Sequence, residues 1–121
     1  MNLFEYQGKR LYQDFSIPTP KSIFVSSISE ISDNHGLTYP VVVKAQVQVG
    51  GRGKAGGIKV AKDFDELTKF SDEILGMDIK GHIVQSLLLE EASDILEEYY
   101  ISFTLDRSAK SYLMMLSAKG G

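Results

Sequence analysis

A glycine-rich segment with clustered cations is the part of this sequence best suited to chemistry. Five of the chain's 11 glycines fall between positions 50 and 57, and no acidic residue lies between positions 44 and 59. Glycine lets backbone N–H groups turn toward a ligand, and rows of such donors bind anions, to which lysine or arginine adds charge. The cations of this segment are Lys44, Arg52, Lys54 and Lys59. The pattern predicts a phosphate-binding loop, although a solvated, flexible hairpin tip would have the same composition.

Two common phosphate-binding motifs do not describe this segment. The P-loop pattern Gly-x-x-x-x-Gly-Lys-Ser/Thr is absent. The letters Gly51-x-Gly53-x-x-Gly56 match a dinucleotide fingerprint, but that motif must open a helix, and the following Ile58-Lys59-Val60 favours a strand. We therefore expect the loop to connect the two strands of a hairpin and to cover phosphates as a flexible lid.

Lys44 closes the β-branched run Val41-Val42-Val43. A lysine is unexpected there unless its ammonium reaches a partner, or emerges into water at the end of the strand. We predict that Lys44 contacts nucleotide phosphates beside Arg52, with a solvated lysine as the alternative. The predicted role fails if the two cations face away from any shared hollow, or are already neutralised by carboxylates of this chain.

A second polar cluster follows the apolar run Leu87-Leu88-Leu89. Five carboxylates lie between Glu90 and Glu98, but no histidine or spaced Asp/Asn set accompanies them, so the pattern does not predict a metal site. A solvated acidic turn explains the composition. Glu90 and Glu98 would also be placed to bond an adenine amino group or ribose hydroxyls.

The elements that must position these residues follow from hydrophobic period and turn residues. We expect helices over residues 3–15 and 27–35, and a third that is capped by Asp63 and ends at Gly76. Residues 90–94 are expected to form a polar turn. Strands are expected over residues 21–25, 39–45, 58–61, 82–89, 95–105 and 110–118. This order indicates an α+β or mixed α/β fold.

The overall composition excludes several classes of protein. With 121 residues the chain is long enough for one domain, and its net charge of −3 does not favour nucleic acid or an acidic membrane as a partner. The absence of cysteine excludes a disulfide framework and thiolate metal sites. Neither a signal peptide nor a transmembrane run is evident, so we expect a cytoplasmic protein.

The apolar run Tyr112-Leu113-Met114-Met115-Leu116 lies close to the carboxyl end of the sequence. A strand this apolar normally has further sheet around it, so we expect the chain to be part of a longer protein; an edge strand is the alternative. Unpaired strands near Met114 also predict that the chain self-associates.

Several blocks along the chain resemble, in order, the opening of the beta subunits of ADP-forming acyl-CoA ligases, most closely succinyl-CoA synthetases. The similarity covers the whole chain and is most specific at Gly50–Gly57 and the amino-terminal Asn-Leu-x-Glu-Tyr-Gln. The blocks are Met1–Lys9, Ile17–Pro20, Val43–Gln46, Gly50–Gly57, Glu90–Ile95 with Glu98 and Tyr100, Asp106–Ser108, and Gly120–Gly121.

The resemblance implies an ATP-grasp fold, in which two α+β lobes clamp ATP or ADP. Residues from about 20 to 103 would form the small nucleotide-binding lobe, and residues 1–19 and 104–121 would belong to the second lobe. Lys44 and the Gly51-Arg52-Gly53 segment would meet the phosphates, while Glu90, Ser93 and Glu98 would meet the base and ribose. Pro20 matches a proline of ATP-using members, which favours ATP over GTP.

The resemblance also implies an intact enzyme that converts succinyl-CoA, phosphate and ADP to succinate, CoA and ATP. Its alpha subunit would carry the phosphorylated histidine, and the Mg²⁺ ligands would lie beyond Gly121, so the chain by itself would be inactive. A malate–CoA ligase or a citryl-CoA synthetase would look the same over these residues. A stand-alone module that binds RNA or another polyanion is a further alternative, but the loop lacks the aromatic residues that favour it.

Overall fold

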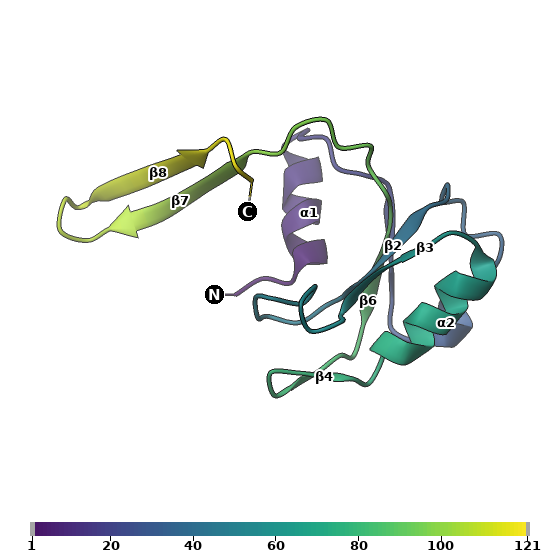
Figure 1. Cartoon of the computed structure of the whole chain (residues 1–121). Coiled ribbons are helices and arrows are strands. Elements are labelled where there is room, and N and C mark those ends of the chain that lie inside the picture. The colour runs from purple at the N-terminus through teal and green to yellow at the C-terminus, as the bar shows by residue number, and fades with distance from the viewer. Residues whose placement is uncertain (1, 121) are drawn as a thin grey trace.

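The computed structural model describes residues 2–120 and has an α+β fold. Two helices and eight strands follow one another along the chain, with a short 3₁₀ turn, η1, after the first strand. Figure 1 shows their arrangement. The elements are α1 (Glu5–Asp14), β1 (Ser22–Val25), η1 (Ile28–Glu30), β2 (Val41–Ala45), β3 (Ile58–Ala61), α2 (Phe64–Ile74), β4 (Asp78–Ile79), β5 (His82–Ile83), β6 (Leu87–Glu91), β7 (Tyr100–Asp106) and β8 (Ser111–Ser117).

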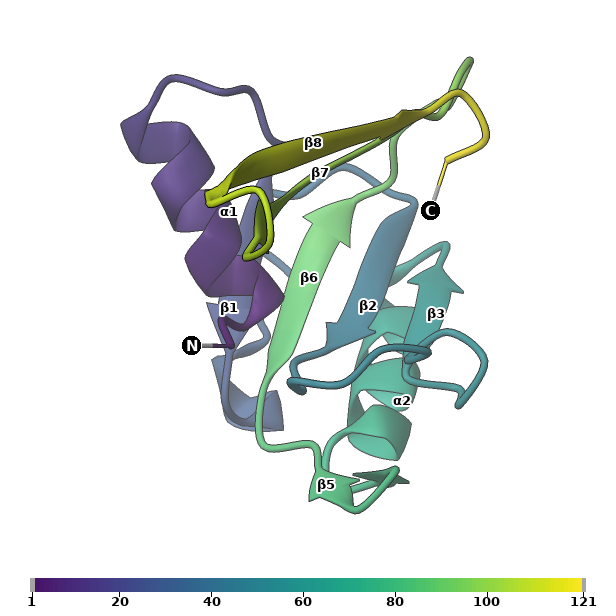
Figure 2. The same cartoon turned by 90° about the vertical axis from the view of Figure 1, so that its left-hand side faces the viewer.

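Four antiparallel strands in the order β1-β6-β2-β3 form the main sheet (Figure 2). Its register aligns Lys44 of β2 with Leu88 of β6 and with Ile58 of β3. Val42 aligns with Glu90 in the same way. Because side chains alternate along a strand, Lys44 and Glu90 project from the same face, as diagonal neighbours on adjacent strands.

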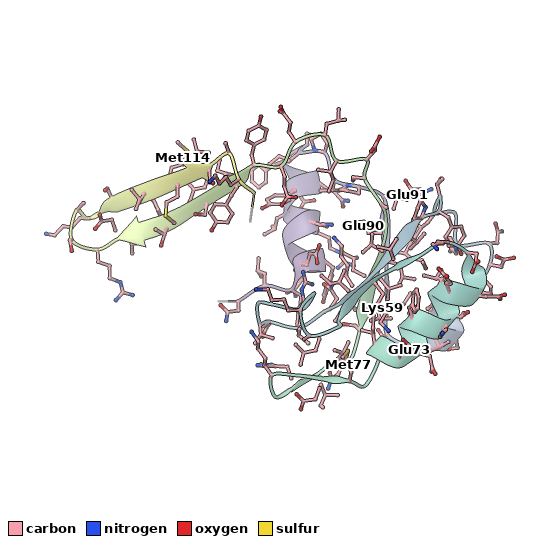
Figure 3. All side chains as sticks on the ribbon, in the orientation of Figure 1. Lys59, Glu73, Met77, Glu90, Glu91 and Met114 are labelled. Atoms are coloured by element: carbon pink, nitrogen blue, oxygen red, sulfur yellow. The ribbon has the colours of Figure 1, made fainter. Side chains whose placement is uncertain are left out.

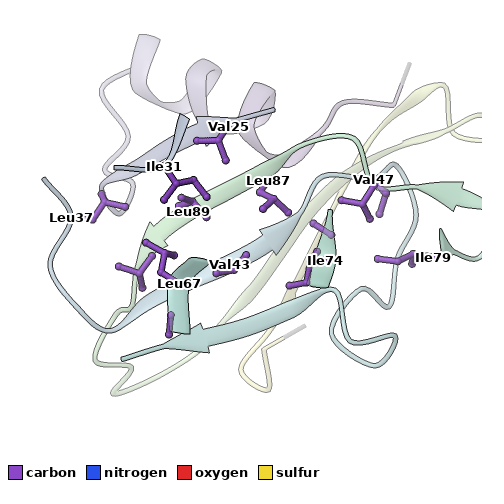
Figure 4. Packing of buried hydrophobic residues seen from close by; sticks show 14 residues of the cluster. Val25, Ile31, Leu37, Val43, Val47, Leu67, Ile74, Ile79, Leu87 and Leu89 are labelled. Atoms are coloured by element: carbon purple, nitrogen blue, oxygen red, sulfur yellow. The ribbon is translucent and has the colours of Figure 1, made fainter. Parts of the chain in front are cut away.

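The hydrophobic core lies on the other face of the sheet, which α2 covers. Figure 4 shows its buried side chains. Val41, Val43 and Ala45 alternate with more exposed residues along β2 and are fully buried. Helix α2 contributes Leu67 and Ile74, and its first turn is capped as predicted, because Asp63 Oδ1 accepts a 2.9 Å hydrogen bond from the Glu66 N–H. The predicted stop at Gly76 is also confirmed, with φ at 84° just after the helix.

Helix α1 packs on the face that carries Lys44 and Glu90 (Figure 1). The ring centroids of Tyr6 in the helix and Phe24 in the sheet lie 4.3 Å apart. The Tyr6 N–H donates a 3.1 Å hydrogen bond to the Gln46 side chain. Strand β6 is therefore covered on both sides, which explains why Leu88 and Glu90 are buried although they project away from α2.

Strands β7 and β8 form a separate two-stranded hairpin that projects from the rest of the molecule (Figures 1 and 2). Their register places six large apolar side chains on one face, and each of these residues is at least 52% exposed. The set consists of Ile101, Phe103, Leu105, Tyr112, Met114 and Leu116.

Two of the predicted elements are wrong in type. The helix expected over residues 27–35 is only the 3₁₀ turn η1, because nearby side chains bond local groups in place of a helical ladder: Glu30 accepts from the Ser26 N–H, and His35 from the Leu37 N–H. The polar turn expected over residues 90–94 would begin at Glu90. In the structure Glu90 and Glu91 are still part of β6 and pair with β2, so the first two residues of the expected turn are strand.

Two predicted strands also have different bounds. The strand expected over residues 82–89 divides into β5 and β6, because β5 folds back on β4 while β6 pairs with β1 and β2. The strand expected over residues 95–105 begins only at Tyr100. The remaining expected strands and the first helix are confirmed to within two residues at each end.

Candidate functional site

The glycine-rich segment connects β2 to β3, as the sequence predicted, and it lines an open hollow of about 900 Å³. The loop contributes Gly50 to Lys54, and the amino-terminal segment contributes Asn2 and Leu3, which precede α1, and Glu5, its first residue. Gly51 has φ at 82°, a left-handed conformation that other residues rarely adopt, so glycine is required for this turn. The hollow is thus built from the loop and the amino-terminal segment together.

The loop residues that line this hollow include backbone donors without an acceptor within residues 2–120. The N–H groups of Ala55, Gly56 and Gly57 bond carbonyls within the loop, at 3.1, 3.1 and 2.8 Å. In contrast, the N–H groups of residues 50–54 donate no hydrogen bond to any residue between 2 and 120. Lys54 is exposed beside them and takes part in no ion pair within the same range. Consecutive free amides with a nearby cation suit an anion such as a phosphate group.

Glu5 is the centre of a charge cluster behind the loop. Its Oε1 lies 3.0 Å from Lys44 Nζ and 3.2 Å from Lys9 Nζ, and its Oε2 lies 2.8 Å from Arg52 Nη2. The Arg52 guanidinium also donates a 2.8 Å hydrogen bond to the carbonyl of Ala45. The contact of Oε2 with Arg52 lacks the alignment of a hydrogen bond, and this buried oxygen has no other partner within residues 2–120.

Glu90 completes the cluster from β6, on the side that faces α1 (Figure 3). Its Oε1 lies 2.7 Å from Lys44 Nζ, and its Oε2 accepts a hydrogen bond from Lys9. Three cations therefore share two carboxylates in a region where the side chains are at most 21% exposed. Such pairing is needed, because a buried charge without a partner is strongly unfavourable.

The cluster changes the acidity of its members. Burial by itself would raise the pKa of Glu5, but the positive charges of Lys44 and Arg52 and the hydrogen bond from Lys44 outweigh it and lower the pKa from 4.5 to about 2. The pKa of Lys9 is lowered, first by burial and then by the positive charge of Lys44. Glu5 is consequently a carboxylate at any physiological pH.

This geometry bears directly on the roles predicted for Lys44 and Arg52. Arg52 lines the hollow, but Lys44 does not, and both cations already contact carboxylates of this chain. Pairing with carboxylates of this chain is the condition under which the predicted role fails, so the arrangement counts against simple phosphate binding by Lys44 and by Arg52. Glu5 holds both of these cations and Glu90 also holds Lys44, whereas Lys54 has no ion pair and the N–H groups of residues 50–54 have no hydrogen-bond acceptor within residues 2–120.

The structure does not bring all the predicted site residues together. Gly51, Arg52 and Gly53 line the hollow, and Glu90 joins the cluster behind it. Ser93 and Glu98 are exposed in the connection between β6 and β7, and Pro20 precedes β1; none of the three lines this hollow. Their proposed contacts with base and ribose stay predictions.

Sequence reasoning missed Glu5 and Lys9 as members of the site. Their spacing of four residues on a predicted helix was a visible signal, since such pairs share one face. The sequence could not show that this face would cover Lys44 and Glu90, because that depends on how α1 packs.

Within residues 2–120, no group of three or more histidine, aspartate or glutamate side chains could hold a metal ion. No helix of the same range has the length and apolar content needed to cross a membrane.

Comparison with solved structures shows the same fold in several proteins. The chain matches the dinucleotide-forming acetyl-coenzyme A synthetase 1 of Ca. Korarchaeum cryptofilum, in complex with coenzyme A and Ca-AMPCP, with a TM-score of 0.81 and 22% identity, over 98% of this chain and 54% of that one. It matches the ATP citrate lyase of Methanothrix soehngenii, in complex with citrate and coenzyme A, with a TM-score of 0.72 and 24% identity, over 98% and 32%.

A further match is the D-alanine–D-alanine ligase of Helicobacter pylori, with a TM-score of 0.68 and 18% identity, over 97% of this chain and 34% of that one. The chain thus spans about half, or less, of the length of these structures. A family model described as an ATP-grasp domain matches residues 2–121, nearly the entire sequence. The chain therefore belongs to the ATP-grasp domain family, and its α+β fold is the ATP-grasp fold.

Proposed function

We propose that this chain forms one wall of the nucleotide-binding cleft in the beta subunit of an ADP-forming succinate–CoA ligase. The intact enzyme would convert succinyl-CoA, phosphate and ADP to succinate, CoA and ATP. The observation that carries the nucleotide-binding part is that residues 50–54, whose backbone N–H groups have no acceptor within residues 2–120, line a hollow of about 900 Å³. The ordered blocks that resemble succinyl-CoA synthetases support the assignment of the reaction.

In this proposal the loop amides and Lys54 receive the phosphates first. Arg52 and Lys44 join them when the phosphate oxygens replace the carboxylate of Glu5, which is comparable in charge and in hydrogen-bonding capacity. Glu90, Ser93 and Glu98 would serve the base and ribose side, with Pro20 favouring adenine. Residues 20–103 would belong to the small lobe, and residues 1–19 and 104–121 to the second lobe.

The proposal assigns no magnesium ligand to the residues of this chain. The alpha subunit is proposed as the partner of the intact enzyme, with the phosphohistidine on that subunit. A cytoplasmic location is also proposed, and the absence of cysteine is consistent with a reducing compartment.

Calorimetric titration with ADP and GDP, each with and without Mg²⁺, tests nucleotide binding by the chain. We expect weak binding that favours ADP, and we expect a loss of about tenfold in affinity in Lys54→Met, since the ammonium contributes a charge-assisted hydrogen bond. Lys69→Met, on the exposed side of α2, is the matched control. Failure of the chain to bind either nucleotide, or equal losses in both variants, would argue against the loop as a phosphate site.

The acid substrate requires the complete heteromer. Its CoA-ligase activity with succinate, malate and citrate distinguishes the proposed enzyme from a malate–CoA ligase or a citryl-CoA synthetase, which would share this nucleotide site. Citrate is included because one similar structure, the ATP citrate lyase, is in complex with citrate and coenzyme A. At 24% identity that similarity shows only the fold. Preference for malate or citrate would refute the succinate assignment while leaving the nucleotide site intact.

A further inference from the structure

The short β4–β5 hairpin contacts the glycine loop at two points. Lys80, at the tip of the hairpin, donates a 2.8 Å hydrogen bond from its ammonium to the carbonyl of Gly50. Ile79, which is 1% exposed, lies beneath Gly57, where a Cβ atom would come within 2.5 Å of its side chain. The two contacts lie at opposite ends of the loop, so the hairpin supports the loop both where it begins and where it ends.

Lys80 adopts an unusual backbone conformation for a lysine. Its φ is 53° and that of Gly81 is 84°, which are the values of a tight hairpin turn with two left-handed residues. Asparagine, aspartate or glycine is preferred at the first of these positions, and a left-handed lysine costs about 1 kcal/mol. Backbone strain of this kind persists where the surrounding structure requires it. The contacts of the Lys80 side chain should therefore give the reason why lysine occupies this position.

The side chain of Lys80 is aimed at the loop and not at a carboxylate. Lys80 takes part in no ion pair within residues 2–120. Its Nζ would lie 3.1 Å from a Cβ atom placed on Gly51, so it occupies the space beside this glycine. Gly50 and Gly51 line the hollow and begin the segment 50–54, whose N–H groups have no acceptor within residues 2–120, so Lys80 contacts the segment that carries these donors.

We propose that Lys80 is a positioning residue that fixes the glycine loop in the shape that presents its amides to an anion. Its ammonium fixes the Gly50 carbonyl, and the N–H groups that follow are left to bind the ligand. The functional meaning of this contact rests on the proposed nucleotide site, but the contact itself can be tested without nucleotide.

Lys80→Asn is the variant of choice, because asparagine suits the left-handed turn and removes only the ammonium. Lys110→Asn is its matched control: Lys110 has φ at 51° at the tip of the β7–β8 hairpin, which projects away from the main sheet (Figure 1). Lys80→Arg keeps the positive charge and tests rescue. Each of the three variants changes a single residue. Loss of the whole fold in one of them would be recognised by comparison with the other two and with the unmodified chain.

Amide hydrogen exchange at Ala55, Gly56 and Gly57, whose N–H groups bond carbonyls inside the loop, reports its shape directly. We expect exchange about tenfold faster in Lys80→Asn, as for the loss of one charge-assisted hydrogen bond, with near-normal rates in Lys80→Arg and Lys110→Asn. Unchanged exchange in Lys80→Asn, or an equal rise in Lys110→Asn, overturns the proposal.

Titration of the same variants with ADP separates this inference from the proposed function. If the unmodified chain binds no ADP, the proposed function fails, and hydrogen exchange still decides whether Lys80 fixes the loop. If it binds ADP, we expect weaker binding in Lys80→Asn and recovery in Lys80→Arg. A loosened loop with unchanged ADP affinity would refute the claim that Lys80 shapes the loop for an anion.

Discussion

The ammonium of Lys44 lies 2.7 Å from the carboxylate of Glu90, across the boundary between strands β2 and β6. The sequence predicted that one residue serves the phosphates and the other serves the base or ribose. The structure joins them in one ion pair, with 18% and 7% of their side chains exposed. Any change at one of these positions therefore alters the environment of the other.

Lys44→Met is expected to destabilise the fold by about 2 kcal/mol, because Glu5 and Glu90 each lose a cation partner in a partly buried site. Urea unfolding at pH 7 measures the change. Lys54→Met serves as the control, since Lys54 is exposed and has no ion pair within residues 2–120, and a change of less than about 0.5 kcal/mol is expected. Equal effects would mean that the pair observed here contributes nothing to stability.

Glu5→Gln is expected to lower the free energy of unfolding at pH 7 and to make that free energy depend less on pH. The pKa of Glu5 is about 2 in the fold against an ordinary 4.5, so the carboxylate stabilises the fold above about pH 4.5 and loses this effect as the pH falls toward 2. The shift corresponds to at most about 3 kcal/mol. The free energies of unfolding of the variant and the unmodified chain should converge as the pH falls from 7 to 2.5.

The control for Glu5→Gln is Asp72→Asn, on the exposed side of α2. It should leave the pH dependence unchanged. Parallel curves for Glu5→Gln and the unmodified chain down to pH 2.5 would contradict the low pKa of Glu5. The same variant also tests the competition with nucleotide, because removal of the internal carboxylate should strengthen ADP binding if phosphates replace Glu5.

Gly57→Ala is expected to destabilise the chain by about 1–3 kcal/mol through overpacking. A Cβ atom there would lie 2.5 Å from Ile79 and 3.2 Å from both Ala45 and the carbonyl of Arg52. At Gly53 the nearest atom is Ile58 Cδ1 at 3.9 Å, an ordinary contact, so Gly53→Ala is the matched control. Thermal unfolding should show a clear drop for the first variant and little change for the second.

Self-association through the apolar face of the β7–β8 hairpin is our last prediction. Two-stranded hairpins are marginally stable alone, and an apolar strand pair whose outer edges are unpaired within residues 2–120 favours pairing with another copy. Sedimentation analysis should show a mass that rises with concentration. Phe103→Glu combined with Met114→Glu should give a monomer, because the two residues face each other on the apolar side.

Thr104→Glu provides the comparison for this pair of substitutions. Thr104 is exposed on the opposite face of the same hairpin, so a negative charge there should leave the apolar face and the self-association intact. A monomeric mass for the unmodified chain at all concentrations, or dissociation by Thr104→Glu, would refute the role of this face.

The sequence by itself determined the elements whose signals are local. Asp63 three residues before Glu66 identified the start of α2, and the glycines between β2 and β3 identified the loop. The run Val41-Val42-Val43 identified a buried strand of the sheet. Each of these depends on hydrogen bonds or side-chain spacing within a few residues, so no distant contact was needed to predict it.

Only the tertiary structure decided which charges meet. Glu5 lies 39 positions from Lys44 in sequence, and the packing of α1 on the sheet brings them within 3.0 Å. The division of residues 82–89 into β5 and β6 likewise depends on two different partners, β4 and the main sheet. Charge pairing and strand pairing across such distances follow from the packing of whole elements, and the local pattern of residues does not contain that information.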